Sequence, residues 1–226
     1  MFPVWLHVLA TLSLLVGVAC AVVITFDETR RPQHMWIMYL VWPLCALFGG
    51  LIWVWLYWRH GRGMPAGHEH HHDNTPMPVA VAKGASHCGA GCTLGDIVAE
   101  WLAFAVPGVA VALGWGSLFA KKTFAVWILD FAFAFLLGVA FQYWTIKPMR
   151  DLSVSEGLVA AVKADTLSIS SWQVGMYGAM AIGQFAILRP LYGRVAPVDS
   201  PEFWFVMQLA MLAGFALFGG YVLNLL

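Results

Sequence analysis

The sequence predicts an all-α protein, a single polytopic membrane bundle of about six transmembrane helices over residues 1–226. Apolar residues make up 61% of the chain and charged residues 11%, whereas soluble globular domains average ~45–50% and ~25%. The apolar runs extend over about 20 residues, which is the length of a spanning helix. They are continuous and do not alternate with period two, so helices are predicted rather than the strands of a membrane barrel.

Six stretches are apolar enough to span a membrane, or nearly so: Phe2–Phe26, Met35–Trp58, Ile97–Phe119, Phe124–Ile146, Leu167–Leu188 and Phe203–Leu226. Tryptophans fall near the ends of these runs, where an aromatic belt would place them. Residues 154–164 can form a short interfacial helix before the fifth span. The long connection over residues 59–86 is rich in His, Gly and Pro, so we expect a flexible loop there.

The charge pattern indicates neither a nucleic-acid partner nor an orientation. Lys plus Arg and Asp plus Glu number 12 each, so no basic field would attract nucleic acid. The expected partners are lipid, a metal ion, and further copies of the chain in a homo-oligomer. With six straight spans, six basic residues lie on each side of the membrane, and the positive-inside rule gives no answer.

The most informative pattern opens the third predicted span. Cys88, Cys92, Asp96 and Glu100 are spaced by four and follow His87, so on a helix they form one stripe. The glycines between them predict a tight loop, followed by a helix from about residue 95. Thiolates beside an imidazole suit Cu(I) or Zn(II), so His87, Cys88, Cys92 and Asp96 are candidate metal ligands. Two neighbouring thiols can instead cycle between dithiol and disulfide, and the plainest alternative is a glycine-rich helix start capped by Asp96.

Two further groups could bind metal. A histidine tract in the long connection comprises His68, His70, His71 and His72. Such tracts gather Cu(II), Ni(II) or Zn(II) loosely, and solvated filler is the alternative. A second group, at the predicted opposite mouth of the bundle, comprises His34, Met35 and Met38. A helix start with a proline near its first turn is the default interpretation of those residues.

Three acidic residues, Glu100, Asp130 and Asp165, belong to a candidate pathway through the bundle. A carboxylate at mid-span costs ~2.5–3.5 kcal/mol on insertion scales, so buried ones usually face a polar interior. We therefore expect Asp130 to point into the bundle, within hydrogen-bond reach of Glu100, Gln173 or Gln208. The alternative is a single interhelical hydrogen bond that only stabilises the bundle.

Gln173 and four methionines complete the candidate pathway: Met176, Met180, Met207 and Met211. Thioethers spaced by four on facing helices can pass Cu(I) between them. Methionine that fills irregular gaps in helix packing is the stronger interpretation of these residues. Cys20 and Cys45 lie inside apolar runs, and we interpret both as small hydrophobic residues.

Several segments together resemble one family: Arg30–Met38, Lys83–Trp101, Asp130–Met149, Glu156–Met176 and Pro201–Phe215. The most specific blocks are His87–Asp96, Lys163–Ser168 and Trp172–Met176. The chain is similar to a group of uncharacterised bacterial integral-membrane proteins catalogued as a domain of unknown function, some of which are labelled "copper oxidase". The resemblance implies a helical protein of the bacterial inner membrane, and it implies no established activity.

The leading hypothesis is a membrane protein that binds and translocates a soft transition metal, with copper ahead of zinc. An enzyme is the less favoured interpretation. It would be a thiol–disulfide oxidoreductase in which Cys88 and Cys92 exchange electrons with a quinone. A metalloenzyme assembly factor that uses the same ligands without transport is a further alternative. The sequence does not distinguish alternating access from an oligomeric pore.

Overall fold

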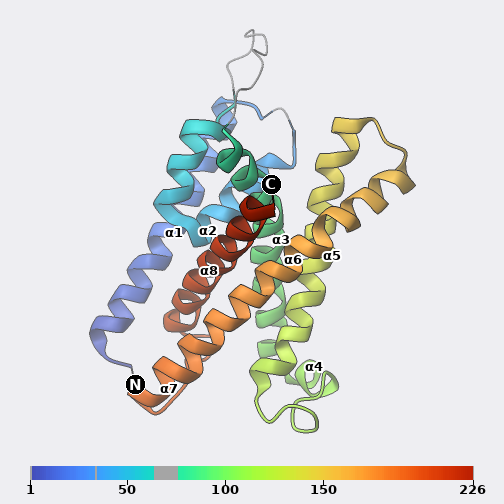
Figure 1. The fold of residues 1–226 in the computed structure, drawn as a ribbon. Coiled ribbons are helices and arrows are strands. Elements are labelled where there is room, and N and C mark those ends of the chain that lie inside the picture. Colours follow the sequence, from blue (N-terminus) through green and yellow to red (C-terminus); the bar gives the residue numbers. More distant parts are fainter. Residues whose placement is uncertain (1, 34, 64–75, 226) are drawn as a thin grey trace.

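The computed structural model describes residues 2–33, 35–63 and 76–225, and these residues are mostly helical (Figure 1). The elements are α1 (Val4–Arg30), α2 (Met38–Leu56), the π-helical turn η1 (Tyr57–Gly61), α3 (Met77–Ala105), α4 (Pro107–Ala112), α5 (Lys122–Arg150), α6 (Val154–Ala181), the π-helical turn η2 (Ile182–Leu188), α7 (Arg189–Tyr192) and α8 (Pro201–Leu225). Within the described residues, extended pairing is limited to an isolated bridge between Trp115 and Phe119. The predicted all-α class is confirmed.

Length and composition support a membrane protein. Three helical segments in the described part of the chain are long and apolar enough to cross a membrane: Val4–Arg30, Met38–Gly61 and Lys122–Arg150. Large apolar side chains also lie on the outside of the bundle, and Leu12, Leu15 and Val22 of α1 are each more than half exposed. Such a surface is unusual in water, whereas in a bilayer it contacts acyl chains.

The helix α2 turns back on itself at Gly50. This residue has φ 51° and ψ −129°, a backbone conformation that glycine adopts readily because it lacks a Cβ. The two limbs then pack side by side. The rings of Trp42 and Tyr57 lie 5.6 Å apart, whereas a straight helix would separate these residues by about 22 Å along its axis. A Cβ on Gly61 would overlap the ring of Trp42. Residues 38–61 therefore form a re-entrant hairpin.

Both ends of the hairpin lie at the same end of the bundle. Gly63, which follows the hairpin, packs against the carbonyl group of Pro32, which precedes it. Asp27 near the end of α1 accepts hydrogen bonds from Nε of Arg62 (2.8 Å) and from the hydroxyl of Tyr57 (2.9 Å). The second predicted span is therefore not a straight crossing helix. The prediction failed because hydropathy measures the length of an apolar segment and not the direction of the chain.

The contact between α3 and α5 is the most extensive between helices of the bundle, and it depends on glycine. A Cβ on Gly91 would lie 2.6 Å from the backbone nitrogen of Gly138, and one on Gly95 would lie 2.6 Å from that of Ala134. Small residues allow membrane helices to approach this closely. The tight loop predicted from these glycines is wrong, because they lie inside the continuous helix α3 and serve its packing.

The ends of α3 also differ from the prediction. The helix begins at Met77, so the loop predicted over residues 59–86 is shorter, and its residues 64–75 lie outside the described part. The helix ends at Ala105 instead of continuing to residue 119. The cause is Pro107, which disfavours the helical conformation at the residue before it, where φ is −127° and ψ is 79°.

The interfacial helix predicted over residues 154–164 is the first part of the longer helix α6. A capping box fixes its start: the Ser153 hydroxyl accepts from the backbone N–H of Glu156, and the Glu156 carboxylate accepts from the backbone N–H of Ser153. The apolar part predicted as the fifth span thus continues a helix that begins more than three turns earlier.

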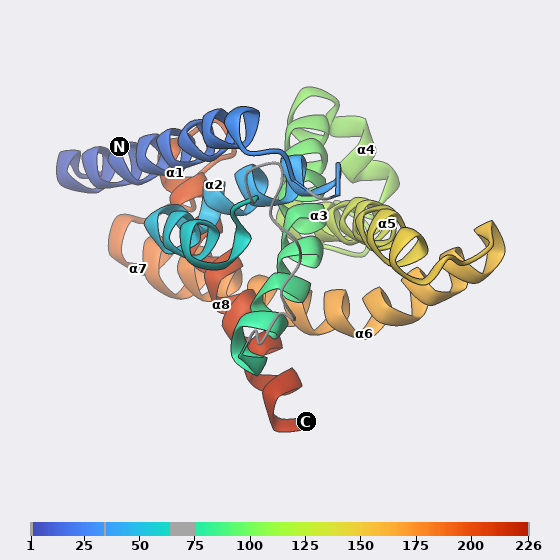
Figure 2. The same ribbon diagram turned by 90° about the horizontal axis from the view of Figure 1, so that it is seen from above.

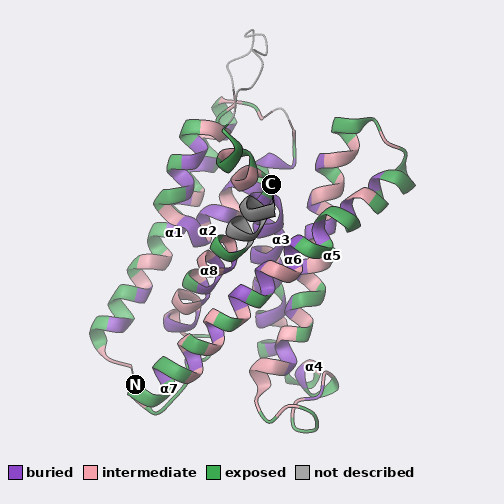
Figure 3. Cartoon of the chain, viewed as in Figure 1, coloured by how far each residue is buried: buried purple, intermediate pink, exposed green. Residues whose placement is uncertain are grey.

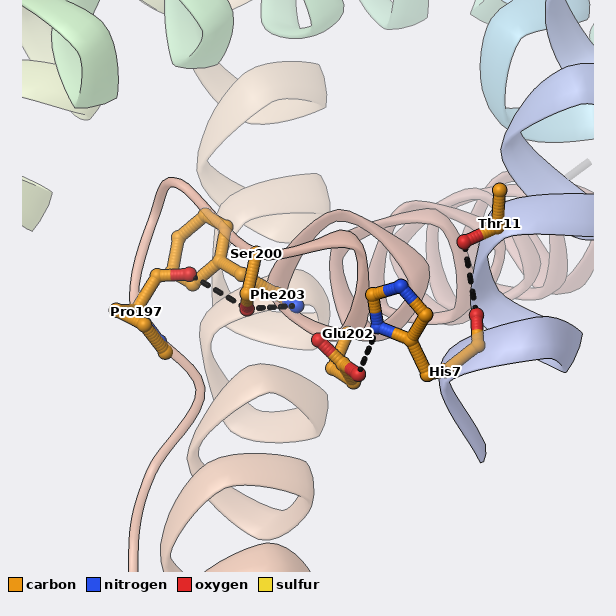
Figure 4. A network of polar contacts seen from close by, with 6 residues as sticks. All are labelled: His7, Thr11, Pro197, Ser200, Glu202 and Phe203. Atoms are coloured by element: carbon orange, nitrogen blue, oxygen red, sulfur yellow. Dashed lines mark hydrogen bonds and ion pairs between the residues drawn. The ribbon is translucent and has the colours of Figure 1, made fainter. Parts of the chain in front are cut away.

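Polar contacts mark the two ends of the bundle. At the first, the His7 end, Nδ1 of His7 on α1 lies 2.9 Å from Oε1 of Glu202 on α8 (Figure 4), and Lys122 of α5 donates to the carbonyl of Ala103 in α3 (2.8 Å). The second, the Asp27 end, is the end at which Asp27 accepts hydrogen bonds from Tyr57 and Arg62. The helices α1, α3, α5, α6 and α8 run between these ends, and α3 lies near the centre when seen from above (Figure 2).

Candidate functional site

A stripe of polar residues on α3 is buried in the centre of the bundle. Cys88 and Cys92 have no exposed surface, and Asp96 and Glu100 are 1% and 4% exposed. Residues four apart on a regular helix lie above one another on one face. The spacing by four therefore does produce one stripe, and buried residues follow α3 along this length (Figure 3).

The stripe begins near the Asp27 end with an imidazole and thiols. Nδ1 of His87 lies 3.2 Å from the hydroxyl of Thr145 on α5. The hairpin adds a thiol that sequence reasoning missed: Sγ of Cys45 donates to the carbonyl of Ser86 (3.1 Å), and its thiol lies close enough to Cys88 for the two groups to interact electrostatically. All the cysteines of the described chain are free. This contact depends on how α2 packs against α3, so the apolar sequence context of Cys45 gave no signal.

Asp165 of α6 reaches into the contact between α3 and α5. Its Oδ2 occupies the place that a Cβ on Gly138 of α5 would need, so glycine at this position makes room for the carboxylate. Gln142 of α5 lies beside Asp165, and Cys92 lies near enough to interact with its charge. Both carboxylate oxygens of Asp165 are buried, with no hydrogen-bond partner of normal geometry in the described chain.

Three carboxylates gather further along α3. Asp130 of α5 is fully buried and interacts electrostatically with Glu100 and Asp96, and Gln173 of α6 lies beside Asp96. Among the described residues, the oxygens of Asp96 and Asp130 and the amide of Gln173 have no hydrogen-bond partner of normal geometry. Asp130 thus lies in the interior, as predicted, but the predicted hydrogen bond to Glu100, Gln173 or Gln208 is missing.

Together these residues form a polar column, composed of His87, Cys88, Cys92, Asp96, Glu100, Asp130, Asp165 and Gln173. Between His87 and Glu100 the column follows α3 for about 20 Å, which is about two thirds of the ~30 Å thickness of a bilayer core. Lys122 interacts with Glu100, and in the described chain it is the one basic side chain that interacts with a column carboxylate. The column therefore contains more acidic than basic side chains.

A cavity of about 260 Å³ adjoins the column beside the hairpin tip. Its wall includes Leu47, Phe48, Thr93, Asp96, Met207 and Met211. Gln208 of α8 braces the tip, because its side chain accepts from the Ser13 hydroxyl (2.7 Å) and donates to the Leu47 carbonyl (2.6 Å). Leu47 and Phe48, just before the turn at Gly50, contribute to the cavity wall, whereas Leu51 and Ile52 just after it are exposed.

The four methionines of the predicted relay are all buried, with exposures of 1–5%. They belong to the main hydrophobic cluster of the bundle. The wall of the cavity beside Asp96 includes Met207 and Met211 of α8, but not Met176 and Met180 of α6. The structure thus divides the predicted relay into a pair at the cavity and a pair in the packed core.

The two predicted metal mouths lie at one end of the bundle. Because the hairpin returns to the side from which it enters, Met35 and Met38 lie at the Asp27 end, as His87 does. Trp36, between the two methionines, packs against Trp144 of α5 with ring centroids 5.5 Å apart. The prediction of a second site at the opposite mouth is therefore wrong. Several predicted ligands lie outside the described residues: His34, His68, His70, His71 and His72.

No preformed metal site exists in the described part of the chain, where no three His, Cys, Asp or Glu side chains are grouped closely enough to hold an ion. The predicted ligands His87, Cys88, Cys92 and Asp96 are instead distributed along the column. What the fold does bring together is pairs of thiols, because Cys88 neighbours both Cys45 of the hairpin and Cys92 of its own helix.

Comparison with known proteins identifies the family. A family model described as "Domain of unknown function (DUF4396)" matches residues 79–219, which is well over half of the chain. The chain belongs to the DUF4396 family. The matched segment contains every residue of the polar column, whereas α1 and the hairpin precede it. No curated protein and no solved structure matches the chain, so a function for this DUF4396 protein has to be inferred from the column itself.

Proposed function

We propose that this protein binds a soft transition metal ion, Cu(I) before Zn(II), and moves it across the membrane along the polar column. The metal is the cargo. The observation that supports this most directly is the set of buried carboxylates on α3, α5 and α6, which continues the stripe of thiols toward the other end of the bundle.

The carboxylates favour transport over a purely structural role. Each one costs ~2.5–3.5 kcal/mol to place at mid-membrane, and intramembrane ionisable residues mark ion paths. A structural role would provide each carboxylate with a hydrogen-bond partner. Among the described residues Asp130 has none, and Asp96 and Asp165 each have only a neighbouring glutamine that does not reach normal hydrogen-bond geometry. A passing cation would provide the missing partner. Transporters also place ion sites beside interrupted helices, and α2 is interrupted at Gly50, close to the cavity that Asp96 lines.

The thiols favour a soft metal as the cargo. Thiolate and thioether sulfur select Cu(I) over hard cations. Structural Zn(II) sites require four ligands in tetrahedral array, and the described residues supply no such group. Cu(I) binds to smaller sulfur sets, and the neighbouring pairs that Cys88 forms with Cys92 and with Cys45 offer one. Met207 and Met211 then place thioether sulfur beside Asp96 at the cavity.

The helical geometry disfavours the thiol oxidoreductase. Residues four apart on a helix have Cβ atoms about 5–6 Å apart, whereas a disulfide needs about 3.5–4.5 Å. Joining Cys88 to Cys92 would therefore distort α3 at the point where Gly91 packs on the backbone of Gly138. A metal ion can bridge two sulfurs at the wider separation without such distortion.

The test is metal uptake by the full chain in proteoliposomes that contain a Cu(I)-sensitive dye, under reducing conditions. Wild type should take up Cu(I) faster than protein-free liposomes. The double variant Cys88→Ser/Cys92→Ser should lose bound metal and transport together. Asp130→Asn should keep metal at the thiols but lose transport, because it removes the carboxylate at the centre of the column.

Matched controls come from residues outside the column. Cys20→Ser changes a buried thiol of α1, and Asp199→Asn changes an exposed carboxylate of the connection before α8. Both should bind and transport Cu(I) like wild type. The proposal fails if wild type moves Cu(I) and Zn(II) no faster than protein-free liposomes, or if the thiol variant transports as well as wild type. Binding without transport would indicate the assembly-factor alternative.

A further inference from the structure

We propose that the Asp27 end of the bundle faces the cytoplasm, so that the thiols take their metal from the cytoplasm and the protein exports it. The orientation follows from the fold and from the positions of the basic residues. The direction of transport rests in addition on the proposed function.

The hairpin changes which basic residues share a side of the membrane. Because residues 38–61 enter and leave at one end, Arg30 and Arg31 lie at the same end as Arg59 and Arg62. The hydrogen bonds of Asp27 with Arg62 and Tyr57 fix this arrangement directly. A straight second span would have placed the first pair of arginines on the opposite side from the second pair.

The remaining helices then alternate between the ends. From the Asp27 end, α3 runs to the His7 end, α5 returns, α6 runs back and α8 returns again (Figure 1). Eight basic residues lie at or near the Asp27 end: Arg30, Arg31, Arg59, Arg62, Lys83, Lys147, Arg150 and Lys163. Four lie at the His7 end: Lys121, Lys122, Arg189 and Arg194.

The eight-to-four distribution of basic residues predicts an orientation, whereas six straight spans would divide them equally and predict none. Lys and Arg of short connections are enriched on the cytoplasmic side, and the first helix usually dominates the choice. Arg30 and Arg31, at the end of the first helix, belong to the side that holds eight of the 12 basic residues. Both indications place the Asp27 end in the cytoplasm and the start of α1 on the outside.

The chemistry of the column agrees with export. The cytoplasm keeps thiols reduced, and thiolates are the form that binds Cu(I). Along α3 the ligands change from sulfur at Cys88 and Cys92 to oxygen at Asp96 and Glu100. Oxygen ligands hold Cu(I) more weakly than sulfur does, so the ion is captured at the cytoplasmic end and released at the other.

The orientation is tested on the full chain with an epitope tag at either terminus, expressed in a bacterium. Protease added to intact spheroplasts should remove the tag at the start of α1 and leave the tag after α8. In inside-out vesicles the pattern should reverse. A third tag inserted at Gly116, in the connection between α4 and α5, should behave like the first tag, because this connection lies at the His7 end.

Two outcomes would overturn the orientation. If both terminal tags are cut in the same preparation, the hairpin does not return to one side. If the tag after α8 is cut in spheroplasts, the Asp27 end faces outward. Either result leaves the proposed function intact when Cys88→Ser/Cys92→Ser still abolishes transport in proteoliposomes. Conversely, the orientation can hold while that transport assay fails.

Discussion

The substitution Gly91→Ala tests the close contact on which the polar column is built. The added Cβ would lie 2.6 Å from the backbone nitrogen of Gly138 and 2.7 Å from its Cα. Carbon atoms in contact prefer about 3.5–4.0 Å, so α3 and α5 would have to separate by about 1 Å. Both obstructing atoms belong to the backbone, and no side-chain rotation can relieve the clash.

The size of the effect is best measured against a control on the same helix. Gly84→Ala also adds a methyl group to α3, but nothing lies within 4 Å of the new Cβ. Both variants gain the helix propensity of alanine over glycine, up to ~1 kcal/mol. Overpacking costs about 1–3 kcal/mol and applies to Gly91→Ala alone. The difference in unfolding free energy between the two variants should therefore be about 1–3 kcal/mol.

Thermal unfolding in detergent, followed by circular dichroism, measures this difference. Gly84→Ala should melt at or above the temperature of wild type, and Gly91→Ala should melt at least about 2 °C below Gly84→Ala. Equal melting of the two variants would show that α3 and α5 do not touch through Gly91. The packing that positions Cys92 and Asp96 would then be wrong as described.

Two further predictions concern the sulfur ligands. Cys45→Ala should weaken Cu(I) binding, measured by competition with a chelator of known affinity, whereas the control Cys20→Ala should leave the affinity unchanged. If Cys45→Ala binds Cu(I) as tightly as wild type, Cys45 does not belong to the site. Met207→Leu/Met211→Leu should slow Cu(I) transport while Met176→Leu/Met180→Leu does not, because the cavity wall includes only the first pair. Met→Leu nearly conserves volume and typically costs less than ~1.5 kcal/mol, so both double variants should fold. If the two double variants transport Cu(I) at equal rates, all four methionines serve packing.

Most of the predicted helix positions are confirmed, because the constraint that lipid places on the backbone acts within each segment. A chain in hydrocarbon must satisfy its backbone hydrogen bonds within the segment, so continuous apolar runs form helices. The interior position of Asp130 follows from the cost of a carboxylate in lipid. The common stripe of Cys88, Cys92, Asp96 and Glu100 follows from spacing by four once α3 is helical.

The errors at the hairpin and at the start of α3 share one cause, which is that glycine has different structural roles at different positions. Gly50 reverses the chain through a positive φ, whereas Gly91 and Gly95 stay helical and admit the backbone of α5. Sequence reasoning assigned the turn to the second set and missed it at the first. Gly138 serves a further purpose, since it makes room for the carboxylate of Asp165.

The sequence by itself determined the helical membrane class, most of the helix positions and the polar stripe on α3, because each depends on hydropathy or on spacing along one segment. The tertiary structure alone decided that α2 is a hairpin, that Cys45 joins the thiols and that Met35 and Met38 lie at the same end as His87. These features depend on which segments face each other across the bundle, and that choice rests on close contacts at single glycines. Changing the direction of the chain at Gly50 leaves hydropathy unchanged, yet it moves Arg30 and Arg31 to the side of Arg59 and Arg62.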